Sequence, residues 1–249
     1  EWAEAALQSD NRSEQELEPS LHAGLYLRLG RRRMTNGDLE TAETFFEKMH
    51  EIASQSGDSG LRDTMIARGA IADIHMARGK LDEALKIREQ EELPVYERLG
   101  DVRSKAVTMG QIADIHMARG KLDEALKMHL KRLSDAQFLQ DVDMIAHIRY
   151  SSANIRLHRG DHSEAPEALQ TILDELVEAF KILRDLQRPD GIGSVGVLLA
   201  QVLAMAGLRD EALDVLGQAR EAFTLLGNAE GLAHIDNLQE AVSSLSQTP

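Results

Sequence analysis

The sequence predicts an all-α protein, built as a right-handed superhelical solenoid of about five helix hairpins. The main observation is an internal repeat: residues 71–86 read IADIHMARGKLDEALK, and the same letters return 41 residues later at 112–127. A period near 40 residues carried by a helical pattern is typical of stacked repeats. The second observation is composition, because 43% of the residues are hydrophobic but only 4% are aromatic. Such a chain favours helices that pack through small and aliphatic side chains.

Each copy of the repeat predicts a helix, a tight turn and a second helix. In the first copy, Gly79 follows the first helix, where a residue able to adopt positive φ is favoured. Asp82 and Glu83 then place negative charge in the first turn of the second helix, where the helix dipole favours it. Ala84 is small enough to let the two helices approach closely. The second copy has the same residues at 120, 123, 124 and 125.

Weaker copies flank the identical pair. The small residue of the second helix recurs at Ala42, Ala84, Ala125, Ala165 and Ala212, with spacings of 42, 41, 40 and 47. The last spacing predicts a longer second helix, from about Ser163 to Gln187. We therefore divide the chain into the end of a preceding repeat with a linker at 1–19, repeats at 20–60, 61–101, 102–142, 143–189 and 190–228, and a C-terminal capping helix at 229–249.

Two local features need separate interpretation. Pro94 falls inside a predicted second helix and should kink or end it near Leu93. Residues 191–196 satisfy the pattern G-x-G-x-x-G, which binds dinucleotides only between a strand and a helix. Because helix and not strand is predicted before Gly191, we expect a flexible loop that opens a helix, and no nucleotide site.

Composition excludes several classes of function. A formal charge of −14 argues against binding to nucleic-acid phosphates, and the absence of cysteine excludes disulfides and thiolate metal sites. No stretch is apolar enough to span a membrane, so we expect a cytoplasmic protein. His158, Asp161 and His162 lack a defined fourth ligand, so no metal is predicted. The chain starts at Glu1 rather than at Met, so we expect it to be part of a longer protein.

The repeats resemble the tetratricopeptide repeat (TPR) family. In the first full repeat, Tyr26, Leu29-Gly30, Ala42 and Phe46 occupy the aromatic, Leu-Gly, small and large-apolar positions of that family. The identical copies depart from the pattern, because Arg88 and His129 stand where a large apolar residue is usual. The period of 40–42 residues is similar to that of a long-helix subclass, which includes kinesin light chains, spindle-orientation adaptors and the sensor region of bacterial maltose-type activators.

The resemblance implies that a peptide or helix binds in a concave groove lined by the first helices. The family's groove positions, carried onto this sequence, form an acidic and Met-rich centre beside a basic end. A different interpretation makes the aspartates solvated helix surface and the methionines core between repeats. The candidate groove residues are Arg28, Arg31, Asp73, Met76, Asp114, Met117, His147, Tyr150, Asn154 and Gln201.

These features together predict a non-catalytic scaffold for protein–protein interaction, which we expect to be one module of a larger regulatory protein. It would bind a protein or peptide partner, with no cofactor, no metal, no nucleic acid and no membrane. The alternative is a small-molecule-sensing or self-associating helical repeat region of a signalling or transcription regulator. The paired aspartates, Asp73 and Asp114, are expected to receive Lys or Arg side chains from the ligand.

Overall fold

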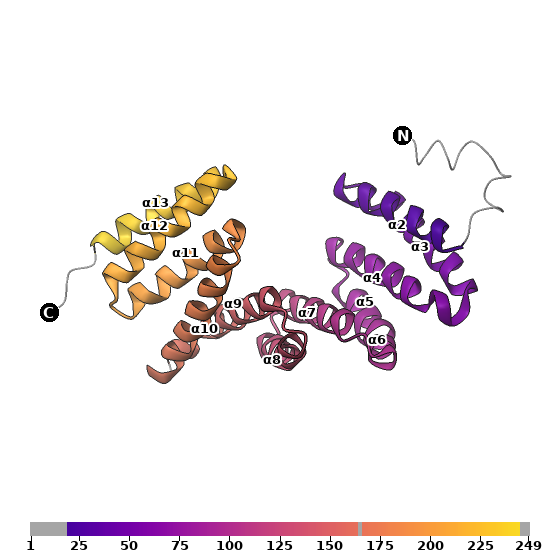
Figure 1. The fold of residues 1–249 in the computed structure, drawn as a ribbon, viewed down its shortest axis with the longest axis horizontal. Helices are drawn as coiled ribbons and strands as arrows, with labels where there is room; N and C mark the ends of the chain where they lie inside the picture. The colour runs from indigo at the N-terminus through magenta and orange to yellow at the C-terminus, as the bar shows by residue number, and fades with distance from the viewer. Residues whose placement is uncertain (1–18, 164–165, 245–249) are drawn as a thin grey trace. The chain divides into compact units, whose positions relative to one another are not determined.

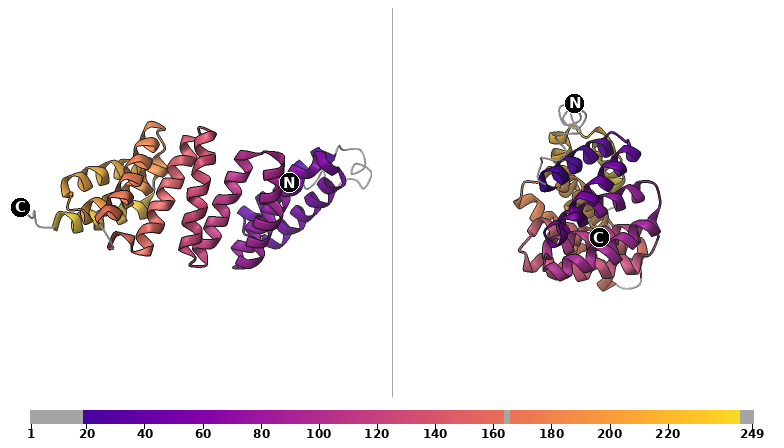
Figure 2. Two further views of the ribbon diagram at one scale, coloured as in Figure 1. Left: turned by 90° about the horizontal axis from the view of Figure 1, so that it is seen from below. Right: turned by 90° about the vertical axis from the view of Figure 1, so that its right-hand side faces the viewer.

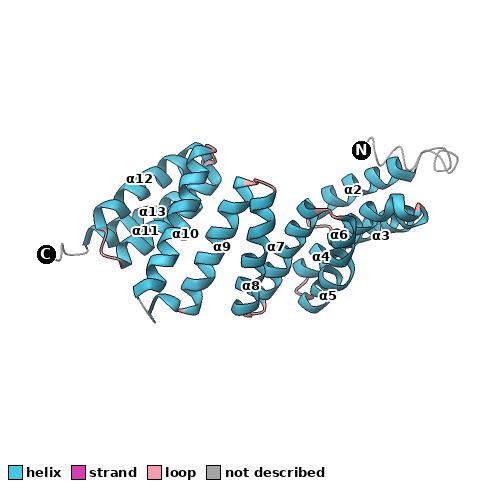
Figure 3. Ribbon diagram, turned by 60° about the horizontal axis from the view of Figure 1, so that its bottom comes forward, coloured by secondary structure: helices cyan, strands magenta, loops and turns pink. Residues whose placement is uncertain are grey.

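The computed structural model describes residues 19–163 and 166–244, and these residues form helices joined by short turns. No strand occurs in this part of the chain (Figure 3). The chain forms two compact units that divide between Lys121 and Leu122. Most of the expected segment at 1–19, and the small residue Ala165, lie outside the described residues. The described helices confirm the predicted all-α class.

Unit 1, which ends at Lys121, contains the first hairpins of the chain (Figure 1). α2 packs on α3, α3 packs on α4, and α4 packs on the helix that follows it. The elements are α2 (Pro19–Thr35), α3 (Leu39–Gln55), a 3-10 turn (Gly57–Gly60), α4 (Leu61–Ala77), α5 (Leu81–Lys86), the π-helical η3 (Ile87–Glu92), α6 (Leu93–Leu99) and α7 (Val102–Ala118).

Unit 2, which begins at Leu122, continues the same alternation of helices (Figure 2). α9 packs on α8 and α10, α11 packs on α10 and α12, and α13 covers α12. The segment where a capping helix was expected therefore contains the helix α13, packed on α12. The elements are α8 (Leu122–Phe138), α9 (Val142–Arg159), a 3-10 turn (Asp161–Ser163), α10 (Pro166–Asp185), α11 (Pro189–Met205), α12 (Arg209–Leu226) and α13 (Ala229–Ser244).

The predicted turns and close helix contacts are confirmed. Gly79 and Gly120 have φ values of 73° and 69°, and the residue after each closes the turn with a backbone hydrogen bond to the carbonyl of the histidine five residues before it. The small residues Ala42, Ala84, Ala125 and Ala212 are all 0% exposed. In unit 1 Ala42 and Ala84 pack with Phe46, Ile71 and Ile74 in one hydrophobic cluster.

Pro94 was expected to kink or end the second helix of its hairpin near Leu93; the helix does not end there, but it changes from π-helical to α-helical geometry at Leu93. The helix continues to Leu99 because it widens into a π-helical turn before the proline, and the Leu93 N–H donates to the Arg88 carbonyl five residues back. A wider turn leaves room for a proline ring that would otherwise clash with the preceding turn. The corresponding helix of the second copy, α8, is a regular α-helix without a proline.

The glycines of the G-x-G-x-x-G pattern lie in helix α11, so the expected flexible loop is wrong. Each glycine lies against a large side chain of a neighbouring helix. A Cβ at Gly191 would be 2.6 Å from Leu183 Cδ2, and one at Gly193 would be 2.3 Å from Phe223 Cε1. These glycines let α11 approach α10 and α12 closely, which is a packing role.

None of the helices that the structure describes is both long and apolar enough to cross a bilayer.

Candidate functional site

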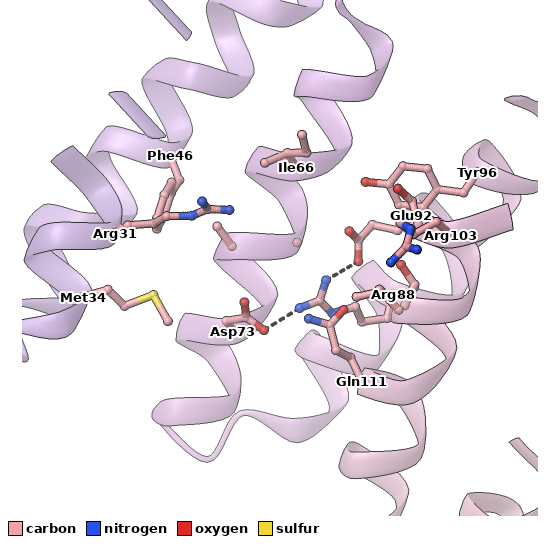
Figure 4. Close-up of a pocket in the computed structure, with 15 residues that line it drawn as sticks. Arg31, Met34, Phe46, Ile66, Asp73, Arg88, Glu92, Tyr96, Arg103 and Gln111 are labelled. Carbon is pink, nitrogen blue, oxygen red and sulfur yellow. Dashed lines mark hydrogen bonds and ion pairs between the residues drawn. The ribbon is translucent and has the colours of Figure 1, made fainter. Parts of the chain in front are cut away.

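A pocket of about 400 Å³ opens in unit 1 between the first helices α2, α4 and α7 (Figure 4). The second helix of the middle hairpin forms part of its wall, because side chains of η3 and α6 reach it. The lining combines charged, hydroxyl and apolar side chains: Arg31, Met34, Phe46, Ile66, Gly69, Ala70, Asp73, Arg88, Glu92, Tyr96, Arg103, Ser104, Val107, Thr108 and Gln111.

Arg88 is at the centre of a buried charge cluster. The residue is 2% exposed, as is Glu92 one π-turn further along the chain. The Nη1 atom donates to Glu92 Oε2 at 2.5 Å, and Nη2 donates to Asp73 Oδ1 at 2.5 Å. Figure 4 shows the guanidinium between the two carboxylates. The π-helical turn therefore places Arg88 and Glu92 side by side and directs both toward α4.

Two carboxylates share this one guanidinium, and they differ in exposure: the Glu92 side chain is buried, whereas the Asp73 side chain is 39% exposed. Burial raises the pKa of both Asp73 and Glu92, and the charge and hydrogen bonds of Arg88 oppose this shift. Burial and the nearby Glu92 charge raise the pKa of Tyr96 to about 12. The Arg88 Nε is buried and has no hydrogen-bond partner among the residues described. Asp73 and Glu92 are thus bonded within the chain before any ligand arrives.

Gly69 makes the space that the cluster occupies. A Cβ at this position of α4 would lie 2.5 Å from Glu92 Oε1 and 2.6 Å from Arg88 Nη1. Real Cβ atoms essentially never make such short contacts with neighbouring atoms. The glycine, the π-helical turn and the buried ion pairs therefore depend on one another.

The outer part of the pocket is positively charged. Arg31 on α2 is exposed, and its guanidinium forms no hydrogen bond or ion pair with the described residues. Burial raises the pKa of Asp73, and the charge of Arg31 is one of the contributions that oppose this rise. Arg103 on α7 also lines the pocket and lowers the pKa of Asp101. With three arginines and two carboxylates, the lining carries a net positive charge in a chain whose formal charge is −14.

The sequence-predicted groove residues of unit 1 occupy different environments. Arg31 and Asp73 line the pocket, whereas Arg28 is exposed on α2 outside it. Met76 packs, partly buried, against the cluster around Phe46, as the core interpretation expected. Asp114 is exposed and Met117 is partly buried, both on α7.

In unit 2, two of the predicted residues line pockets. His147 and Tyr150 contribute to a pocket of about 340 Å³ between α9 and α11, where Arg188 bonds Asp143 and Asp190. Tyr150 also reaches a second pocket of about 550 Å³ beside α13. The other two predicted residues, Asn154 and Gln201, are partly buried and line neither pocket.

Sequence reasoning missed Arg88 and Glu92 as site residues. The available signal was a charged residue at a position that is usually large and apolar, followed by an acid four residues later. The second copy has His129 and Leu133 at these positions, so the charged pair is specific to the first copy.

No group of three potential metal ligands is found in the described parts of the chain. His158, considered above as a ligand, has its Nδ1 2.9 Å from the Asn154 carbonyl oxygen.

Comparison with known proteins places the fold among TPR-like repeat proteins. A putative kinesin light chain from Podospora anserina with nearly identical TPR-like repeats is 19% identical, with a TM-score of 0.64 over 86% of this chain and all of that one. The apo form of RapI is 13% identical, with a TM-score of 0.78 over 99% of this chain and 65% of RapI. A Rap protein in complex with Competence and Sporulation Factor is 15% identical, with a TM-score of 0.65 over 94% of this chain and 68% of that protein.

No protein-family model matches the sequence, and no curated protein matches it. The structural similarities confirm the TPR-like fold predicted from the repeats. This chain is therefore an all-α repeat protein with tetratricopeptide-like helix hairpins.

Proposed function

We propose that the chain is a non-catalytic protein-interaction module that binds a peptide or helix of a partner protein on the first-helix face of unit 1. The observation that carries this proposal is the pocket between α2, α4 and α7. Its mixture of apolar walls and a few fixed polar groups is the chemistry by which grooves gain affinity from side-chain contacts and register from charge.

The similar structures support the class of ligand. Two Rap proteins of this fold are described as complexes, one with Competence and Sporulation Factor and one with the Phr* peptide. A fold that holds peptides in those proteins offers this chain the same kind of surface. The proposal extends only this general capacity, because the sequence identities are 15% and 17%.

The charge cluster around Arg88 affects which residues are available to contact the ligand. Arg88 already bonds Asp73, so this aspartate is a poor acceptor for a ligand cation. The second copy has His129 at the position of Arg88, so the two copies of the identical cassette would make different contacts. Arg31, Met34 and Val107 remain as groups that a ligand can reach.

A small-molecule effector is the second candidate, because a pocket of about 400 Å³ lies within the usual size range for such ligands. If a small molecule is the ligand, peptides selected on the protein would not bind in the pocket. Small polar compounds that bind there would instead raise the melting temperature of the protein.

The test is selection of peptides from a displayed random library on the whole chain, followed by binding measurements on two variants. Ala70→Gln introduces into the pocket the residue that the second copy carries at the same position, Gln111. Ala77→Gln makes the same change at an exposed position of α4 outside the pocket. We expect selected peptides to bind Ala70→Gln about tenfold more weakly and Ala77→Gln as wild type. Equal binding to both variants would exclude the pocket.

A further inference from the structure

Asp73 and Arg31 lie on facing helices of the pocket but differ in what they are bonded to. Asp73 accepts a hydrogen bond from the buried Arg88, whereas Arg31 is bonded to none of the described side chains. An isolated aspartate in a half-buried pocket would attract a Lys or Arg side chain. An aspartate that already accepts from one guanidinium, in a pocket that a second guanidinium also lines, has little attraction left for a third cation.

We propose that Arg88 sets the charge selectivity of this pocket, so that it takes a carboxylate group on Arg31 and excludes the cationic side chain that Asp73 alone would attract. Arg88 thus acts as a positioning residue, because it keeps Asp73 away from Arg31. The inference deepens the proposed function and rests on it for the source of the carboxylate, which is an acidic side chain or the terminal carboxylate of a bound peptide.

The surroundings of Arg31 suit such a group. A guanidinium pairs with a carboxylate through two parallel hydrogen bonds. Met34, Ile66 and Val107 line the same pocket and offer apolar contact to the stem that carries the carboxylate. Arg103 adds a second positive charge on α7, and Gln111 adds amide hydrogens. The positive charges of Arg31 and Arg103 favour an anionic ligand.

The second copy of the cassette supplies a matched comparison for the role of Arg88. Its sequence has His129 and Leu133 at the positions of Arg88 and Glu92. The double substitution Arg88→His/Glu92→Leu therefore removes both buried charges together and leaves neither unpaired. Asp73 is then free to bind Arg31, and we expect the carboxylate to bind more weakly.

The experiment is a titration of the isotopically labelled whole chain, followed through its backbone amide and arginine Nε–H signals. The probes are hexanoate and pentylammonium, which carry the same five-carbon tail and opposite charges. We expect hexanoate to give saturable shifts in α2, α4 and α7 and pentylammonium to give none. Arg31→Gln should weaken hexanoate binding about tenfold. Arg32→Gln, at an exposed neighbour on α2 that does not line the pocket, should leave it unchanged.

Other results would overturn the inference. Pentylammonium shifts that disappear in Asp73→Asn would show that Asp73 accepts a cation. Hexanoate binding that survives Arg31→Gln, or binding of neither probe, would remove Arg31 as the receptor. Unchanged hexanoate binding by a folded Arg88→His/Glu92→Leu protein, checked by circular dichroism, would remove the role of Arg88.

Two peptides then distinguish the sources of the carboxylate. One is blocked at both ends and carries a central Glu, Ac-Ala-Leu-Glu-Leu-Ala-NH2, and the other has its only carboxylate at the terminus, Ac-Ala-Leu-Leu-Ala-OH. The peptide that shifts the Arg31 signal identifies the source and supports the inference. If hexanoate binds through Arg31 and neither peptide does, the charge selectivity stands and the proposed peptide-binding function fails.

Discussion

At the scale of single residues, the site depends on Gly69 as much as on its charged groups. The absence of a side chain on this turn of α4 lets Arg88 and Glu92 lie against the helix. Side chains in a well-packed interior have little freedom to move away from an added atom. The glycine therefore shapes the pocket although it offers no chemical group of its own.

We predict that Gly69→Ala lowers the free energy of unfolding by about 1–3 kcal/mol, because its Cβ overlaps the buried ion pair. Gly24→Ala is the matched control in helix α2, where nothing lies within 4 Å of the added Cβ. It should stabilise the protein by about 0.5–1 kcal/mol, since alanine is the better helix former. Urea unfolding of both variants measures the difference, and equal changes would contradict the packing of Gly69.

His129 in unit 2 gives the protein a pH-dependent stability. It is 1% exposed, and burial, with the nearby Arg132 and His147, lowers its pKa from 6.5 to about 4. Between these values the unfolded chain binds a proton that the folded chain does not bind. Stability is therefore complete above pH 6.5 and decreases as the pH falls toward 4.

We predict that wild type loses about 2.5 kcal/mol more unfolding free energy than His129→Leu when the pH is lowered from about 7 to about 4.5. Asp73, Glu92 and Glu175 have raised pKa values and act in the opposite direction, but they are common to both proteins. Equal losses of unfolding free energy in wild type and His129→Leu would show that folding does not lower the pKa of His129.

The groove positions of the TPR family identified two residues of the pocket lining. Arg31 and Asp73 were found because they occupy positions that first helices of this family turn toward the groove. Arg88 and Glu92 lie on the second helix, where the same rule expects packing residues. Their burial depends on a π-helical turn and a glycine on another helix, and neither contact can be inferred from spacing along the chain.

At the scale of elements, the identical cassettes end in different helices. The sixteen shared letters form the end of the first helix, the glycine turn and the start of the second helix in both copies. Beyond residue 86 the first copy widens into a π-helical turn before Pro94, whereas α8 stays regular to Phe138. Local sequence outside the cassette therefore decides whether a second helix can direct charges into the pocket.

We predict that Ala84→Trp destabilises the protein by about 1–3 kcal/mol or more, because this position is 0% exposed within the hydrophobic cluster of unit 1. Lys86→Trp, an exposed change in the same helix, serves as the control and should have an effect below about 0.5 kcal/mol. Thermal unfolding of both variants gives the comparison. A neutral Ala84→Trp would disprove the close approach of these helices.

The sequence predicted helix positions well where periodicity and turn glycines agreed. It was wrong about the G-x-G-x-x-G pattern, and at Pro94 it located an irregularity but did not predict that the helix continues beyond it. Both proline and glycine are expected to break helices when only the chain itself is considered. In the structure a π-helical turn accommodates the proline, and neighbouring helices use the glycines for close packing.

At the scale of the whole molecule, packing within each unit follows the order of the chain. The extensive helix contacts join elements that follow one another, with α13 reaching both α11 and α12. Repeat proteins of this kind have stability that is nearly a sum of local terms. A destabilising substitution in one unit should therefore affect mainly the helices that pack around it.

We predict that Gly69→Ala speeds amide hydrogen exchange in α4, α6 and α7 and leaves α11, α12 and α13 unchanged. The physical reason is that the overlap it creates lies in unit 1 and the later helices make their contacts in unit 2. Amide hydrogen exchange of wild type and Gly69→Ala, measured by mass spectrometry, tests this prediction. Faster exchange throughout the chain would indicate one cooperative structure instead.

The central claim is that the first-helix face of unit 1 binds a peptide. Its most direct test is to attach a spin label to a peptide selected on the protein and to measure which amide signals of the whole chain it broadens. The account predicts broadening concentrated in α2, α4 and α7 around the pocket. Broadening confined to the second helices α3 and α5, or to unit 2, would contradict it.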